Sequence, residues 1–281
     1  MKLSAEQIKG RIRNIAKENG ADARAIIRIF MMERFLERLS ESKYRDNVIV
    51  KGGFLVTSLV GVSMRSTMDI DARIKNINLS IEDVTKMVKD VCSIDLDDGI
   101  TFVIKDATTI MDEADYPGIR FIIDASIDKI QIPFKLDIST DDIITPAEVQ
   151  HDYKLLLEDR YITLWSYNIE TLLSEKIQTV LSRGILNTRM RDFYDIHAIQ
   201  SIYAKRISYD ILSNALVSTC EKRGTLNVLD ESGKILQDIS NDKIMQERWK
   251  VYQNKYDYAS DTDFNEILLL INRLMDLIKT N

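Results

Sequence analysis

The chain contains little cysteine, proline and glycine for its length. Of its 281 residues, two are cysteines, three are prolines and ten are glycines. Cys92 and Cys220 lie far apart and show no metal-ligand spacing, so the sequence supports neither a disulfide framework nor a zinc site, and a reducing cytoplasm fits this usage. The scarcity of turn residues, together with long periodic stretches of Leu, Ile, Lys and Glu, favours a helix-rich mixed α/β chain.

Long apolar runs are missing as well. Residues 1–17 lack the continuous apolar stretch of a secretory signal, and Glu6 argues against a transit peptide. The apolar segment 267–278 is interrupted by polar and charged residues and is too short to span a bilayer. We therefore expect a cytoplasmic protein with no membrane partner. The net charge of -6 argues against non-specific coating of nucleic acid but leaves room for a local basic surface.

Hydrophobic periodicity predicts a mixed N-terminal domain over residues 1–150. Ser4 and Gln7 are spaced as a capping box, and Gly20 is placed where the first of two amphipathic helices ends. Pro133 suggests that its strand lies at an edge or carries a bulge at that point. The pattern predicts helices within 4–39, 54–60 and 83–92, and strands at 46–51, 68–74, 100–105, 120–125 and 130–139.

The remaining chain, residues 151–281, is expected to form a helical C-terminal domain. After Pro146 the strand-like alternation gives way to helical periodicity for most of the chain, and we place the domain boundary near residue 150. Apolar residues recur at helical spacing over 169–180 and again from Phe193 to Ile202. The sequence therefore predicts two domains of different composition.

Two carboxylates share one face of the expected strand 68–74. Asp69 and Asp71 alternate with the apolar Ile70 and Ala72, as in a half-buried strand. Mg²⁺ prefers oxygen ligands and is usually held by one or two carboxylates plus substrate phosphates, so such a pair supplies suitable ligands. The same pair also occurs on exposed strand faces that bind no metal.

Gly52 and Gly53 lie between an expected strand and an expected helix. Backbone N–H groups at a glycine turn that opens a helix can approach phosphate oxygens closely, because no side chain intervenes and the helix dipole favours an anion. The alternative is a turn with no ligand.

Asp137 lies on the polar face of the expected strand 130–139. Together with Asp69 and Asp71 it could hold two metal ions roughly 3.5–4 Å apart, which would stabilise the attacking and leaving oxygens of an in-line displacement. Asp137 is then the expected activator of the attacking hydroxyl. The alternatives are a solvated edge residue or an ion pair with Lys135. The order and context of these motifs favour a metal site beside a phosphate-binding turn.

A second group of charged residues lies in the helical domain. Lys176 could place a point charge on triphosphate oxygens, and Asp192, three residues before Asp195, could orient it. Spacing alone favours the alternative, a buried ion-pair network between two helices. His151 and His197 show no Cys or Ser arranged as a nucleophile–base pair, and we expect no catalytic role for them.

These residues resemble the AbiEii/AbiGii toxin family of nucleotidyltransferases. The resemblance runs from the N-terminal helices to about residue 199 and implies an α+β fold, a DNA-polymerase-β-like nucleotidyltransferase core with a helical C-terminal domain. The matching segments are 33–40 (ERFLERLS), 50–54 (VKGGF), 65–71 (RSTMDID), 133–137 (PFKLD), 175–176 (EK) and 191–195 (RDFYD).

The resemblance also assigns roles by position. It implies a nucleoside triphosphate (NTP) substrate, GTP in some relatives and pyrimidine nucleotides in others, and Mg²⁺, with two ions expected. The catalytic residues are then Asp69, Asp71, Asp137, Lys176 and Asp192, of which Asp69, Asp71 and Asp137 are also the metal ligands. The nucleotide-binding residues are Gly52, Gly53, Arg65, Ser66, Thr67 and Lys176.

In function, the resemblance implies the toxin of an abortive-infection toxin–antitoxin system with a separately encoded antitoxin. Such a toxin would transfer a nucleoside monophosphate to the 3′ end of tRNA and so block translation and growth. Two alternatives remain open from the residues. One is a nucleotidyltransferase that modifies a protein side chain, and the other is a non-catalytic GTP/NTP-binding module that sequesters a partner.

Overall fold

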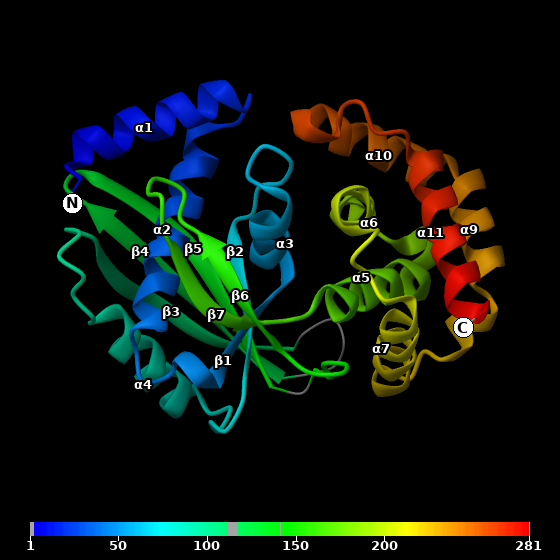
Figure 1. The fold of residues 1–281 in the computed structure, drawn as a ribbon, viewed down its shortest axis with the longest axis horizontal. Coiled ribbons are helices and arrows are strands. Elements are labelled where there is room, and N and C mark those ends of the chain that lie inside the picture. Colours follow the sequence, from blue (N-terminus) through cyan, green and yellow to red (C-terminus); the bar gives the residue numbers. More distant parts are fainter. Residues whose placement is uncertain (1–2, 112–116, 141, 281) are drawn as a thin grey trace. The chain divides into compact units, whose positions relative to one another are not determined.

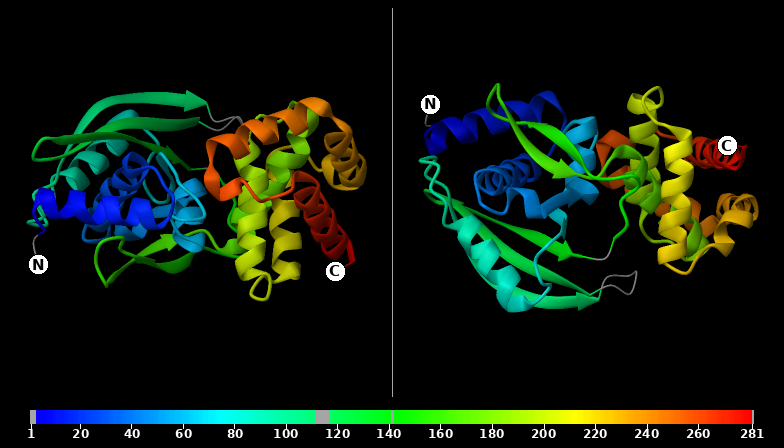
Figure 2. Two further views of the ribbon diagram at one scale, coloured as in Figure 1. Left: turned by 90° about the horizontal axis from the view of Figure 1, so that it is seen from above. Right: turned by 60° about the horizontal axis from the view of Figure 1, so that its bottom comes forward.

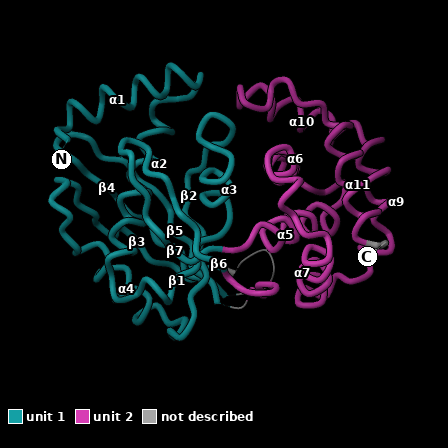
Figure 3. Tube along the Cα trace, in the orientation of Figure 1, with its two compact units in different colours: residues 1–141, 149–166 teal, residues 142–148, 167–281 magenta. Residues whose placement is uncertain are grey.

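The computed structural model describes residues 3–111, 117–140 and 142–280 and divides the chain into two compact units (Figures 1 and 3). Unit 1 comprises residues 1–141 and 149–166, and unit 2 comprises 142–148 and 167–281. The sequence places the boundary near residue 150, whereas the hairpin 149–166 belongs to unit 1 because its strands pair with the sheet of that unit. The expectation of helical structure directly after Pro146 is wrong for this hairpin.

Unit 1 is an α+β unit built on one mixed sheet, which can be followed in Figures 1 and 2. Its strand order is β3-β4-β5-β2-β1-β7-β6, with β2–β5 and β1–β7 parallel and the other neighbours antiparallel. The strands are β1 (Val48–Lys51), β2 (Asp69–Ile74), β3 (Thr101–Met111), β4 (Pro117–Ile127), β5 (Ile130–Ser139), β6 (Val149–Lys154) and β7 (Tyr161–Ser166). The helices are α1 (Ala5–Glu18), α2 (Ala23–Ser40), α3 (Gly52–Val60) and α4 (Ile81–Cys92).

The expected elements of this unit are confirmed, including the capping box of Ser4 and Gln7 on α1. The expected edge position of strand β5 is wrong, because β5 lies inside the sheet between β4 and β2. Pro133 pairs with Asp124 of β4 in a continuous register, and the described pairing with β2 begins only at Lys135. Proline is tolerated there because the missing N–H falls outside the β2 ladder.

The core of unit 1 lies between α2, α4 and one face of the sheet. Phe35 of α2 packs edge-on against Phe102 and Phe134. The alternation of β2 and β5 sends their apolar residues to this face and leaves the opposite face polar. A small apolar space in the core is lined by Phe35, Leu36, Leu39, Val48, Ile70, Ala72, Met87, Val88, Val91, Leu136 and Ile138.

Arg38 of α2 is a charged residue inside this apolar layer. Its guanidinium donates two hydrogen bonds to the Asp98 carboxylate at 2.9 and 2.7 Å and one to the Ile100 carbonyl at 2.9 Å. The Arg38 side chain is only 1% exposed, so these bonds replace the water that it loses on folding.

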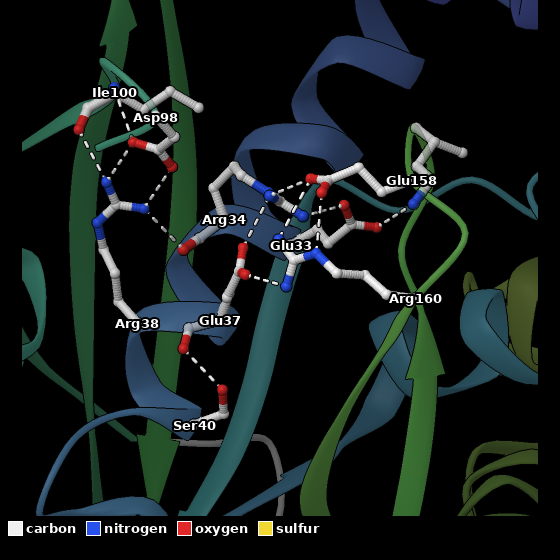
Figure 4. A network of polar contacts seen from close by, with 10 residues as sticks. Glu33, Arg34, Glu37, Arg38, Ser40, Asp98, Ile100, Glu158 and Arg160 are labelled. Carbon is white, nitrogen blue, oxygen red and sulfur yellow. Dashed lines mark hydrogen bonds and ion pairs between the residues drawn. The ribbon is translucent and has the colours of Figure 1, made fainter. Parts of the chain in front are cut away.

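Arg34 forms a second part of the same ionic network, one turn earlier on α2 (Figure 4). It lies 2.9 Å from Glu33, 2.7 Å from Glu37 and 2.9 Å from Glu158 in the β6–β7 turn. Arg160 of that turn also pairs with Glu37 and Glu158. The α2 network, defined as Glu33, Arg34, Glu37, Arg38, Asp98, Glu158 and Arg160, thus fastens α2 to the turn and to the segment directly before β3.

Unit 2 is helical, as expected. Leu172, Ile177, Phe193 and Ile196 of the predicted apolar stripes are fully buried, whereas Ile202, near the end of its helix, is 47% exposed and lies outside the core. The helices are α5 (Ile169–Arg183), α6 (Met190–Tyr203), α7 (Tyr209–Lys222), α8 (Asn227–Asp230), α9 (Ser232–Asn241), α10 (Lys243–Lys255) and α11 (Phe264–Thr280). Within the described ranges, no helix has the length and apolarity needed to cross a membrane.

Candidate nucleotide site

Strand β2 presents Asp69 and Asp71 on the polar face of the sheet. Ile70, Ala72 and Ile74 are buried, and Asp69 and Asp71, which alternate with them, are half-buried. Both carboxylates therefore lie on the face opposite the apolar core, as the alternation predicts.

Gly52 brings the backbone of α3 directly against Asp71. The helix begins at Gly52, whose φ is +64°, a value that L-residues rarely adopt. A Cβ atom added at Gly52 would lie 2.0 Å from Asp71 Oδ2, and the Gly53 N–H donates to the same oxygen at 3.3 Å. Glycine is therefore required at position 52 both for the turn and for the close approach.

The loop before β2 packs against Gly53. A Cβ atom at Gly53 would lie 2.8 Å from Thr67 Oγ1 and 3.1 Å from Arg65 Nη2. Thr67 Oγ1 donates to Asp69 Oδ1 at 2.8 Å, and the buried Arg65 donates to the Ser66 carbonyl. The structure thus brings the predicted residues 52, 53, 65–67, 69 and 71 together in one place.

Burial among other carboxylates raises the pKa of Asp71 to about 7. The main cause is desolvation of its carboxyl group, and repulsion from Asp69 and Asp137 adds to it. Lys51 and the Gly53 N–H act in the opposite direction but do not cancel the shift. A cation placed between these carboxylates would relieve the repulsion.

Asp137 is a neighbour of Asp71 but has a different partner. The two aspartates are directly opposite each other in the parallel β2–β5 pair. Arg120 of β4 holds Asp137, with Nε–Oδ1 at 2.8 Å and Nη2–Oδ2 at 2.6 Å. The expected alternatives for Asp137, a solvated residue or a pair with Lys135, are both wrong.

The donor set fits a divalent cation at Asp69 and Asp71, with further ligands left to a bound triphosphate. The expected cluster of three carboxylates is not seen. Within residues 3–111, 117–140 and 142–280, no group of three or more His, Cys, Asp or Glu side chains is arranged to hold a metal ion. Metal ligation by Asp137 stays a prediction.

Lys176 and Asp192 meet inside unit 2. Lys176 Nζ lies 2.6 Å from Asp195 Oδ2 and 3.1 Å from Asp192 Oδ1, and Asp192 also pairs with Arg189 at 2.7 Å. Burial raises the pKa of Asp192, but Lys176 and Arg189 outweigh it, so that the pKa lies below its ordinary value. The network between α5 and α6 is thus present, and a catalytic role for Lys176 and Asp192 stays a prediction.

Sequence reasoning missed two neighbours of the carboxylates. Lys51 and Arg120 flank the carboxylates across the strands, and only strand pairing, which the sequence does not reveal, could have identified them. Apart from these two residues, Ser58 Oγ lies 2.9 Å from His151 Nε2, a contact that the sequence does not reveal. The expectation that His151 has no catalytic role stays a prediction. Burial lowers the pKa of His151.

A mixed sheet with a glycine turn at the start of a helix and a paired-aspartate strand beside it is the arrangement on which the resemblance to nucleotidyltransferases rests. The model of the family described as "Nucleotidyl transferase AbiEii toxin, Type IV TA system" matches residues 34–269. The chain belongs to this family. It is therefore a nucleotidyltransferase of the toxin class, and the family implies an NTP substrate and a separate antitoxin.

One solved structure supports the fold. A candidate nucleotidyltransferase from H. pylori aligns with a TM-score of 0.50 and 19% identity over 90% of this chain and 94% of its own. The protein JHP933 from Helicobacter pylori aligns with a TM-score of 0.47 and 19% identity over 88% of each chain. No curated protein matches the chain.

Proposed function

We propose that this toxin transfers a nucleoside monophosphate from an NTP to the 3′ end of tRNA, with Mg²⁺ bound by Asp69 and Asp71. The observation that carries the proposal is the joint position of the α3 N-terminus and the two carboxylates, with the Gly53 N–H on Asp71. Backbone N–H groups at a helix N-terminus attract phosphate, and the carboxylates attract its counter-cation.

In the reaction, the 3′-hydroxyl oxygen of the acceptor forms a bond to the α-phosphorus, and the bond from that phosphorus to the bridging oxygen breaks, releasing pyrophosphate. When bound, Mg²⁺ neutralises charge on the phosphate oxygens. Gly52 allows the backbone to lie against Asp71, while Thr67 holds Asp69 by its hydroxyl, so both carboxylates are oriented before the substrate binds. As the new bond forms, the proton of the hydroxyl passes to solvent water.

An assay with separately labelled triphosphates tests the proposal. The purified full chain is incubated with Mg²⁺, total tRNA and one α-labelled NTP at a time. We expect label on tRNA with one or a few bases, lost in Asp69→Ala and retained in Asp106→Ala, an exposed aspartate of β3 in the same sheet. Loss in Lys176→Ala as well, with an unchanged melting temperature, would assign Lys176 to catalysis.

The same assay separates the alternatives. Label on protein instead of tRNA contradicts the tRNA acceptor and favours a side-chain hydroxyl. NTP binding without a labelled product, together with toxicity that survives Asp69→Ala, contradicts transfer altogether and favours a sequestering module.

A further inference from the structure

One cross-strand row of the sheet carries four charged side chains. Lys51 of β1 is opposite Asp71 of β2, Asp71 is opposite Asp137 of β5, and Asp137 is opposite Arg120 of β4. Residues directly opposite each other share a face of the sheet. The charge row, defined as these four residues, therefore lies on the polar face that also carries Asp69, with a cation at each end.

Arg120 occupies both oxygens of Asp137. The pair is bidentate, with distances of 2.8 and 2.6 Å, and the Asp137 side chain is 18% exposed. A metal ion that used Asp137 would have to compete with this guanidinium for the same lone pairs. This geometry suits a carboxylate that orients an arginine better than it suits a metal ligand.

The guanidinium of Arg120 keeps further donors. It has five N–H groups in a rigid fork, of which Nε–H and one Nη2–H point to Asp137. Its side chain is 37% exposed, so an anion can reach it. Arginine binds phosphate in a bidentate way, and Asp137 fixes the side chain in advance, which lowers the entropy lost on binding.

We propose that Arg120 binds the triphosphate of the nucleotide and that Asp137 is its positioning residue rather than a third metal ligand. The inference rests on the proposed function for the identity of the ligand. It assigns the Arg120 end of the charge row to phosphate binding and leaves Asp69 and Asp71 to bind the cation.

Two binding measurements on the full-length protein test it. Mn²⁺ binding without nucleotide is followed by electron paramagnetic resonance, and binding of a fluorescent NTP analogue is followed with Mg²⁺ present. We expect Arg120→Ala and Asp137→Asn each to weaken nucleotide binding about tenfold. Mn²⁺ affinity should stay within about twofold of that of the unchanged protein. The double variant should bind nucleotide no more weakly than either single variant. Arg13→Ala, an exposed arginine of α1, is the matched control and should change neither.

Asp69→Asn serves as the reference for loss of a metal ligand. The proposal is overturned if Asp137→Asn loses Mn²⁺ as Asp69→Asn does, or if Arg120→Ala tightens Mn²⁺ binding, since Asp137 is then a ligand masked by Arg120. It is also overturned if Arg120→Ala and Arg120→Lys bind nucleotide as the unchanged protein does. If nucleotide binding depends on Arg120 but no label is transferred to any acceptor, the proposed function fails and this inference stands.

Discussion

Unit 1 contains two charged clusters, the α2 network and the carboxylates of β2. Both come from segments that resemble the same family, but their charges are neutralised differently. In the α2 network each carboxylate contacts an arginine (Figure 4), and Arg34 and Arg38 are almost completely buried. On β2, the described hydrogen bonds to Asp69 and Asp71 come from neutral donors, the Thr67 hydroxyl and the Gly53 amide, and Lys51, the cation opposite Asp71, does not cancel the raised pKa of Asp71. The comparison teaches that buried, paired charges hold the fold, while crowded carboxylates with neutral donors are suited to bind a cation.

Removing a carboxylate from β2 should have the largest effect, and that effect should be on binding. We expect Asp71→Asn to lower Mn²⁺ affinity at least about 10–100-fold, since even indirect contacts to a metal cost that much. The melting temperature should hold or rise, because the desolvation of a buried charge, which is the main reason for the raised pKa of Asp71, and the repulsion from Asp69 and Asp137 are both removed. A clear fall in melting temperature would contradict the distinction between the two clusters.

Removing an arginine from the α2 network should instead affect stability. Arg38→Met removes the guanidinium donors from Asp98, which keeps only the Ile100 N–H, and from the Ile100 carbonyl, and we expect the unfolding free energy to fall by about 3 kcal/mol. Denaturant unfolding measures it. Nucleotide affinity of the folded fraction should not change, and a selective loss of affinity would show that the network serves the site directly.

A pair of glycine substitutions sharpens the role of the turn. Gly52→Ala forces a strained backbone and a clash with Asp71, and we expect a cost of about 1–3 kcal/mol together with weaker NTP binding. Gly10→Ala, in the exposed interior of α1 with open space around it, should stabilise by about 0.5–1 kcal/mol. Equal effects in the two variants, measured by denaturant unfolding, would remove the argument for a special turn.

The smallest expected effect is a change in pH dependence. Burial raises the pKa of Glu33 to about 7, against the opposing effects of Arg34 and the Leu156 N–H. Since the folded state keeps the proton that the unfolded state loses above its pKa of about 4.5, this group stabilises most below pH 4.5, and its contribution is lost as pH rises through 7. Melting temperatures of Glu33→Gln should therefore fall less between pH 5 and 8 than those of the unchanged protein. If the melting temperatures of the two proteins changed in parallel between pH 5 and 8, the raised pKa of Glu33 would be contradicted.

Much of unit 1 could be predicted because local patterns decide it. Alternation identified β2 and β5, and Gly52-Gly53 identified the start of α3. The hairpin β6–β7 was missed because its strands are short and partly exposed, so their apolar alternation is weak. The position of β5 was missed because a proline argues for an edge strand. In the structure, only the first half of β5 lacks pairing with β2, and the second half pairs with it.

For the site, the sequence predicted the types of residue but not all the partners. Asp69, Asp71 and the glycines were predictable because their spacing and their surroundings are local. Arg120 and Lys51 were not, since pairing between strands far apart in the chain places them beside the aspartates.

The sequence by itself determined the alternating strands, the glycine turn and the carboxylates on one strand face, because each depends on side-chain periodicity or on backbone freedom over a few residues. Only the tertiary structure decided that Asp137 is held by Arg120 and that the charges of α2 neutralise one another. Those pairings depend on strand order, register and the packing of α2 against the turn of a distant hairpin, which no local pattern encodes.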